Sequence, residues 1–249
     1  MKKYCLNKKE LRYLTSQFNN DLMGIGYSLG TDSQEELRIQ ESLLSKDYAV
    51  SDFDCPFSVE ADLAVLLNEC NQWNKLVHFS STSLDRNDAF ERFFIVQDVS
   101  IREAKEGDAI YIERMDKDVI YGELDQFFTV QEKCISSDES YLVNAKRIEI
   151  LSQLRKDRLL REIRNDGCPN QLANTVADAL TGKGEYISVS VIERTTADIH
   201  IKKKLTACSL EDSFLIIHPE VKNEKQYIRF EIGTITKLEF ELSMMRSVI

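Results

Sequence analysis

Apolar residues recur at helical spacing in three segments near the start of the chain. Asn7 and Glu10 stand at the two positions of a capping box, and leucines follow on one face of the expected helix. Ser33 and Glu36 repeat this motif before a second segment, and Ser58 precedes a third with acidic residues in its first turn. The pattern therefore predicts three helices, capped by Asn7, Ser33 and Ser58.

Short apolar segments of the kind that form strands follow these helices. In chain order, we expect strands over residues 75–81, 92–98, 108–114 and 118–122. The polar segment 115–118 is short enough for a tight turn, so the last two strands are expected to form an antiparallel hairpin.

The second half of the chain repeats the order of helices followed by strands. Residues 139–166 predict one charged helix, which Gly167 and Pro169 end, and another helix begins at Asn170. Four strands and a closing helix follow, over residues 186–193, 198–204, 213–218, 226–231 and 235–245.

Runs of helices followed by runs of strands predict the α+β class, with a largely antiparallel sheet flanked by helices. The order occurs twice, and segment 108–124 resembles segment 212–232 when about four residues are inserted. We therefore expect two pseudo-twofold related halves, an acidic helix-sheet half over residues 1–130 and a charge-neutral one over residues 131–249.

Charge is distributed unevenly along the 249 residues, whose formal net charge is −10. Residues 1–125 hold 14 basic and 24 acidic side chains, and the remainder holds 18 of each. The longest apolar run, at residues 63–67, is far shorter than the roughly 20 residues of a membrane-spanning helix. With no apolar segment behind the basic start, we expect a cytoplasmic protein without a secretory signal.

The residue types that carry chemistry are scattered. The six cysteines form no C-x-x-C motif and predict reduced thiols, and the three histidines lack the spacing of a metal site. The glycines at 24, 26 and 30 follow a helical pattern instead of a strand, which argues against a dinucleotide-binding loop. We therefore expect a protein that is not an enzyme, with no catalytic residue, no metal and no cofactor.

Two basic clusters are candidates for nucleic-acid contacts, namely the charged helix at 139–166 and Lys202–Lys204. Acidic residues alternate with the basic ones in the first cluster, and lysines at the end of a strand protect a sheet edge. The first half, moreover, has an acidic excess that repels phosphates. We expect no nucleic-acid partner.

The order of elements in residues 5–130 resembles that of a known family. A capped helix begins at Asn7, a second ends near Tyr48, a short extended piece and a third helix follow, and a strand meander ends at Leu124. This order is similar to that of the EspG-like and EsaE-like cytoplasmic chaperones of type VII secretion systems. The resemblance implies an α+β fold with quasi-twofold halves and the holding of a secreted protein before export.

The resemblance also implies a contact region, because a loop between early strands of the sheet contacts the substrate in such chaperones. The corresponding segment is 80–88, where Leu84 is a lone apolar residue among polar ones. Arginine is enriched at interfaces, so we take Leu84, Asp85 and Arg86 as candidate partner-binding residues.

Two other functions fit the same sequence features. An immunity or antitoxin-like protein that binds a toxin would also be acidic, cytoplasmic and without catalytic residues. A winged-helix regulator would have helices followed by a pair of strands, although the half that carries them is acidic. The expected partner is a protein, either a secretion substrate or a toxin.

Overall fold

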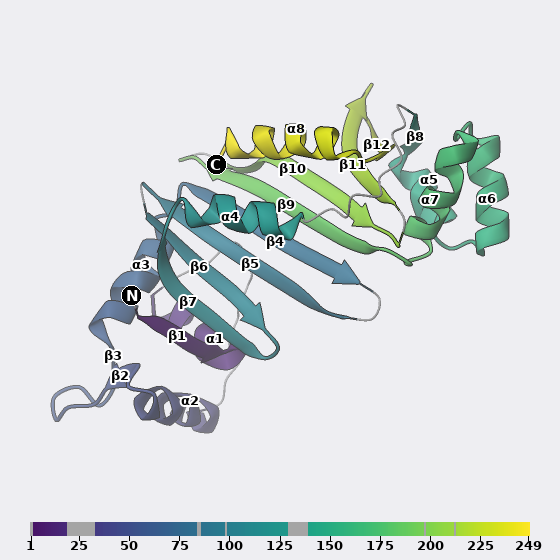
Figure 1. Ribbon diagram of the computed structural model, residues 1–249. Helices are drawn as coiled ribbons and strands as arrows, with labels where there is room; N and C mark the ends of the chain where they lie inside the picture. The colour runs from purple at the N-terminus through teal and green to yellow at the C-terminus, as the bar shows by residue number, and fades with distance from the viewer. Residues whose placement is uncertain are drawn as a thin grey trace. The chain divides into compact units, whose positions relative to one another are not determined.

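The computed structural model describes residues 2–18, 33–83, 86–97, 99–128, 139–196, 198–211 and 213–249 (Figure 1). The chain divides into two compact units. The first contains Met1–Val77, Phe90–Ile120 and Ile192–His200, and the second contains His78–Ala89, Tyr121–Val191 and Ile201–Ile249. Among the described residues, no helix is both long and apolar enough to cross a membrane.

One order of elements occurs twice along the chain: a strand, three helices, four strands and a closing helix. The first series is β1 (Lys3–Asn7), α1 (Lys8–Gln17), α2 (Ser33–Ser45), α3 (Ala61–Asn71), β4 (Lys75–Ser83), β5 (Arg86–Val96), β6 (Val99–Glu106), β7 (Ala109–Asp116) and α4 (Val119–Phe127). The short pair β2 (Ala49–Val50) and β3 (Ser58–Val59) lies between α2 and α3. The second series is β8 (Ser140–Asn144), α5 (Ala145–Leu151), α6 (Lys156–Asn165), α7 (Asn170–Leu180), β9 (Glu185–Arg194), β10 (Ile199–Ser209), β11 (Phe214–Lys222), β12 (Lys225–Ile232) and α8 (Ile235–Arg246).

The strands confirm the predicted α+β class with an antiparallel sheet. Ten of them form one sheet in the order β1-β7-β6-β5-β4-β9-β10-β11-β12-β8. In both series, the first strand pairs with the last: Tyr4 of β1 stands opposite Ile112 of β7, and Tyr141 of β8 stands opposite Phe230 of β12. The repeated order that the sequence predicts is therefore present in both elements and strand pairing.

The predicted hairpin of 108–114 with 118–122 is wrong. Residues 118–122 belong largely to the helix α4, in which Ile120 and Leu124 are buried one turn apart. The hairpin partner of β7 is β6, a strand that the sequence did not predict, with Ala104 opposite Tyr111 and a left-handed Gly107 in the turn. A short apolar run is compatible with either a strand or a helix. In this segment, the packing of the buried residues favours the helix.

The resemblance between segments 108–124 and 212–232 is also misaligned. It matches β7 with β11 and α4 with β12, whereas the repeated order of elements matches β7 with β12 and α4 with α8. The likeness of these segments reflects a shared apolar composition and not equivalent positions in the fold.

Three helix boundaries differ from the sequence predictions. Residues 139–166 form β8, α5 and α6 instead of one helix, since Asn144 caps α5 through its side chain, which accepts a hydrogen bond from the Lys146 N–H. Ser58 lies in β3, and Glu60 caps α3 in its place. Ser33 is the first residue of α2 and not the residue before it.

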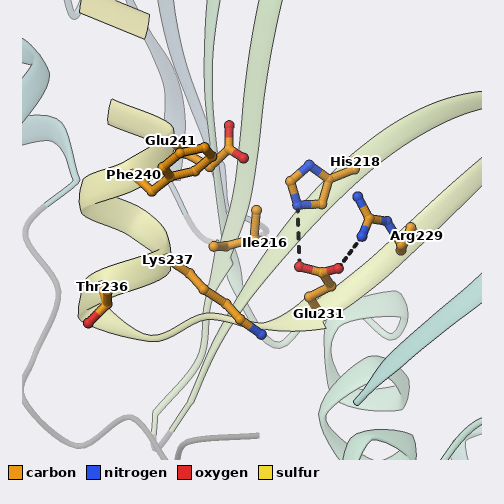
Figure 2. A pocket seen from close by; sticks show the side chains of 8 residues that line it. All are labelled: Ile216, His218, Arg229, Glu231, Thr236, Lys237, Phe240 and Glu241. Atoms are coloured by element: carbon orange, nitrogen blue, oxygen red, sulfur yellow. Dashed lines mark hydrogen bonds and ion pairs between the residues drawn. The ribbon is translucent and has the colours of Figure 1, made fainter. Parts of the chain in front are cut away.

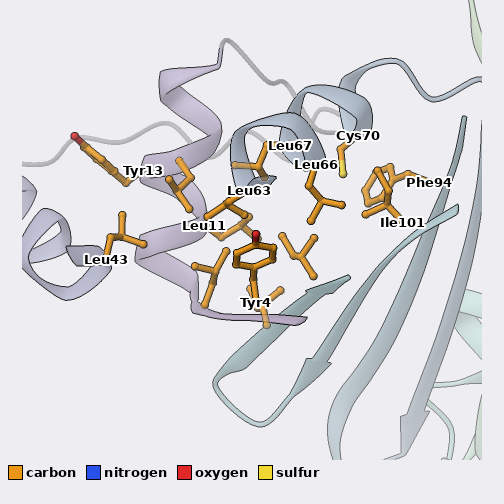
Figure 3. Close-up of a cluster of buried hydrophobic side chains, with 14 of the residues drawn as sticks. Tyr4, Leu11, Tyr13, Leu43, Leu63, Leu66, Leu67, Cys70, Phe94 and Ile101 are labelled. Carbon is orange, nitrogen blue, oxygen red and sulfur yellow. The ribbon is translucent and has the colours of Figure 1, made fainter. Parts of the chain in front are cut away.

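The core of the first unit lies between the helices α1 to α3 and one face of β1, β7 and β6 (Figure 3). Tyr4 and Ile112 stand opposite each other on that face, and Leu11, Leu63 and Leu67 cover them from the helices. This apolar burial is the main stabilising contribution to the unit.

The core of the second unit has the same construction. Tyr141, Leu215 and Phe230 lie on one face of β8, β11 and β12, and α5, α6 and α7 contribute the buried residues that pack on them, among them Leu159 and Leu172. Because strand side chains alternate between faces, the neighbouring residues of these strands point away from the three helices.

Candidate functional site

A groove of about 410 Å³ lies in the second unit between α8 and the strands β11 and β12 (Figure 2). We call it the α8 groove. Its lining residues come from all three elements: Ile216, His218, Arg229, Glu231, Thr236, Lys237, Phe240 and Glu241.

Strand register explains why the floor residues lie together. Ile216 stands opposite Glu231, and His218 stands opposite Arg229, so the four side chains share one face of the sheet. This face is the one that points away from α5, α6 and α7. The floor is therefore fixed by the β11–β12 ladder.

The wall of the groove is the helix α8. Thr234 caps this helix, and its side-chain oxygen accepts a hydrogen bond of 3.2 Å from the Lys237 N–H. Leu238, Leu242 and Met245 are buried on the inner side of α8, whereas Phe240 is 62% exposed at the groove. The helix thus offers an unburied aromatic ring beside a charged floor.

Apolar surface continues around the α8 groove. Met244, one turn after Phe240, is 40% exposed, and Leu142 of β8 is 37% exposed. Leu142 stands opposite Arg229 on the same face of the sheet. The exposed apolar residues therefore lie on both α8 and the strand at the end of the sheet.

Charged side chains and one imidazole occupy the polar part of the groove. Nε2 of His218 lies 3.7 Å from Oε2 of Glu231, and a guanidinium nitrogen of Arg229 contacts the same carboxylate. Nε of Arg229 lies 2.6 Å from Oε1 of Glu220. At the wall, Nζ of Lys203 lies 3.3 Å from Oε2 of Glu241. Each of these carboxylates faces a cation or an imidazole, so the charges are compensated locally.

Two groups of this network have shifted pKa values. Burial lowers the pKa of His218, with a further contribution from Arg229, and these effects outweigh the attraction of Glu231. The hydrogen bond from Lys222 lowers the pKa of Glu220, and the positive charge of Arg229 adds to this effect. At neutral pH the imidazole is therefore mostly uncharged, and Glu220 is ionised.

This arrangement is typical of a protein-binding surface. Phe240 and Met244 are exposed beside ion pairs that are already formed, and protein interfaces combine apolar contact area with satisfied polar groups in this way. Within the part of the chain that the structure describes, no group of three or more His, Cys, Asp or Glu side chains is placed to hold a metal ion. The absence of metal and cofactor stays a prediction.

Of the predicted partner-binding residues, Leu84 and Asp85 lie outside the described residues. Arg86 is the first residue of β5, and β4 extends to Ser83, so the expected loop at 80–88 is mostly strand. The prediction of a long loop is wrong, because polar residues continue both strands. The contact of these three residues with a partner stays a prediction.

The sequence did not point to the α8 groove. It predicted strands around His218 and Arg229 and a helix over 235–245, but not the register that brings them to one face. One signal was present: Phe240 and Met244 are one turn apart and lie off the buried stripe of α8.

Comparison with known proteins supports the fold. No protein-family model and no curated protein sequence matches the chain. The structure of the Mycobacterium tuberculosis type VII secretion system chaperone EspG5, in complex with the PE25–PPE41 dimer, aligns with 100% of this chain and 97% of its own at a TM-score of 0.65 and 10% identity. A candidate adenylate cyclase from Bacillus halodurans aligns at a TM-score of only 0.14. The chain therefore has the same fold as the chaperone EspG5.

Proposed function

We propose that this protein is a non-enzymatic chaperone or adaptor that binds a secreted protein of a type VII-like secretion system. The observation that carries the proposal is the likeness of fold to EspG5, which extends over the full length of the chain. The solved structure of EspG5 holds a protein dimer, and a protein partner for this chain is consistent with its compensated, partly apolar groove.

The α8 groove is the binding surface that we assign to this function. Phe240 and Met244 would contact apolar side chains of the partner, and their burial would supply the affinity. On the groove floor, the ion pair of Arg229 with Glu231 and the imidazole of His218 would select the partner's polar groups. Leu84, Asp85 and Arg86 remain a second proposed contact.

A chaperone of this kind acts before export, so we also propose that the protein works in the cytoplasm. Its role would be to cover apolar surface on the secreted protein until the secretion machinery receives it. Such a role requires binding and release but no covalent chemistry, in keeping with the locally paired carboxylates of the groove.

The test begins with identification of the partner. The chain is tagged in its own host, and bound proteins are identified by mass spectrometry and compared with the proteins of the culture medium. The proposal expects a bound protein that is also exported. A bound protein that stays in the cell, or duplex DNA, would contradict it.

The partner is then titrated calorimetrically with the wild type and with the double variant Phe240→Ala, Met244→Ala. We expect the dissociation constant to rise at least about tenfold, equivalent to roughly 1.4 kcal/mol. The variant Val221→Ala serves as the control, because Val221 is an exposed apolar residue outside the groove lining. An equal dissociation constant for all three proteins would remove the groove from the proposal.

One observation favours a second function, an immunity protein that binds a toxin. The acidic excess of residues 1–125 would complement a basic partner. Expression of the partner alone distinguishes the two functions. A toxin stops growth unless this chain is present, whereas a secretion substrate leaves growth unchanged.

A further inference from the structure

The loop between β2 and β3 carries the most exposed large apolar side chain among the described residues. Ala49 pairs with Val59 and Val50 with Ser58, so the strands hold both ends of the seven residues 51–57, which we call the Phe53 loop. The relative exposure of Phe53 is 102%, which means that no part of its ring is covered. This loop belongs to the first unit, whereas the residues of the α8 groove belong to the second.

Hydrogen bonds within the Phe53 loop fix its conformation. The Asp52 N–H donates to the Cys55 carbonyl over 2.9 Å, and the Asp54 N–H donates to Oδ1 of Asp52 over 2.9 Å. At the end of the loop, the ring of Phe57 meets the ring of Tyr13 edge-on, with centroids 5.7 Å apart. Phe53 is therefore presented on an ordered support, which lowers the entropy cost of binding through it.

Two carboxylates flank the exposed ring. Asp52 and Asp54 are both exposed, and within the described residues neither forms an ion pair. A single exposed phenylalanine is common on protein surfaces. This one stands between two unpaired carboxylates on an ordered loop, so the ring can act as an apolar anchor and the carboxylates can attract positive charge. A matching surface must supply an apolar cavity and positive charge around it.

We propose that Phe53 inserts into an apolar pocket with a rim of lysine or arginine on the protein that this chain binds. The inference rests on the proposed function for the existence of that partner, and adds the chemistry of its surface. Burial of the ring supplies affinity, and Asp52 and Asp54 pair with the basic rim. A membrane is the disfavoured alternative, because the aspartates are repelled by anionic lipid surfaces.

The experiment measures binding of the purified partner to four forms of the full chain: wild type, Phe53→Ala, the double variant Asp52→Asn, Asp54→Asn, and the control Val221→Ala. We expect Phe53→Ala to weaken binding about tenfold or more. The Asp52→Asn, Asp54→Asn variant is expected to bind more weakly at low salt and to lose much of the salt dependence of the wild type. All four melting temperatures should agree, since the changed residues are exposed.

A photo-crosslinking amino acid in place of Phe53 locates the contact. We expect it to label an apolar segment of the partner with lysine or arginine nearby. Equal affinities of the wild type and Phe53→Ala overturn the inference while leaving the proposed function standing. If the partner is not exported but Phe53→Ala fails to bind it, the inference holds and the proposed function fails. Phe53-dependent binding to phosphatidylcholine vesicles without a protein crosslink also overturns it.

Discussion

Nε2 of His218 lies 3.7 Å from Oε2 of Glu231, on the floor of the α8 groove. The pair is only partly solvent-exposed, with 21% of the His218 side chain and 16% of the Glu231 side chain accessible. Burial nevertheless lowers the pKa of His218, so the neutral imidazole is the form that the fold prefers. The groove therefore responds to acid.

We predict the direction in which acidification changes the stability of the protein. Because the folded pKa of His218 lies below its unfolded value of 6.5, its contribution to stability is complete above pH 6.5 and is lost as the pH falls through the folded pKa. Denaturant unfolding of the wild type and His218→Gln between pH 5 and pH 8 checks this. The wild type should lose more stability on acidification than the variant. A variant that loses as much as the wild type would contradict the prediction.

A buried carboxylate in the first unit gives the second prediction. Glu10 is fully buried, and its oxygens accept hydrogen bonds from the Asn7 N–H, the Ser42 hydroxyl and the Lys46 ammonium over 2.6–2.7 Å. We expect Glu10→Ala to lower the free energy of unfolding by about 2–4 kcal/mol, since it removes the capping box and two further contacts. Urea denaturation measures the change.

The control for Glu10 is Glu35→Ala, which removes a surface ion pair with Lys9. Both partners of that pair are substantially exposed, so the expected loss is below about 1 kcal/mol. If the two variants lose equal stability, burial of Glu10 has no special importance for the fold.

Two glycines should respond oppositely to alanine. A Cβ at Gly233 would overlap the ring of Phe214, and the Gly233 N–H donates to the Phe214 carbonyl over 2.7 Å, which holds the backbones close. We expect Gly233→Ala to cost about 1–3 kcal/mol. A Cβ at Gly122, within α4, has no neighbouring atom within 4 Å, so Gly122→Ala should stabilise the protein by up to about 1 kcal/mol. Thermal unfolding of both variants provides the comparison, and a stabilised Gly233→Ala would contradict the predicted packing.

The cysteines should differ in reactivity. Burial raises the pKa of Cys168 and of Cys208 to about 12 and raises that of Cys70 as well, whereas Cys55 is exposed. Iodoacetamide at pH 8 should therefore label Cys55 in the native protein and the three buried thiols only after unfolding. Peptide mass spectrometry reads the labelling of each site, and rapid native labelling of Cys208 would be the contrary result.

Sequence alone predicted the parts of the fold that depend on local chemistry. The capping box of Asn7 and Glu10 is present, and α6 and α7 end and begin where Gly167 and Asn170 predict. The prediction failed where packing decides: segment 118–122 is helical, and β1 and β6 were not predicted. Burial against distant residues determined these elements, and that information is absent from a local pattern.

The candidate site was harder to predict from the sequence than the fold was. His218 and Phe240 are 22 residues apart and come together only through the β11–β12 register and the docking of α8. Ion pairs between strands also have no recognisable sequence motif, because any acidic and basic residues at suitable register positions can form them. By contrast, Leu84 and Arg86 were chosen from residue type and from a loop position that the family resemblance implies, and neither determines a contact surface.

Export of the partner tests the central proposal most directly. In the host, the gene for this chain is deleted, and the amount of the partner in the culture medium is measured by quantitative mass spectrometry. The account predicts that export of the partner falls strongly, that wild type and Val221→Ala restore it, and that the variant Phe240→Ala, Met244→Ala restores it poorly although it folds equally well. Unchanged export in the deletion strain would contradict the account.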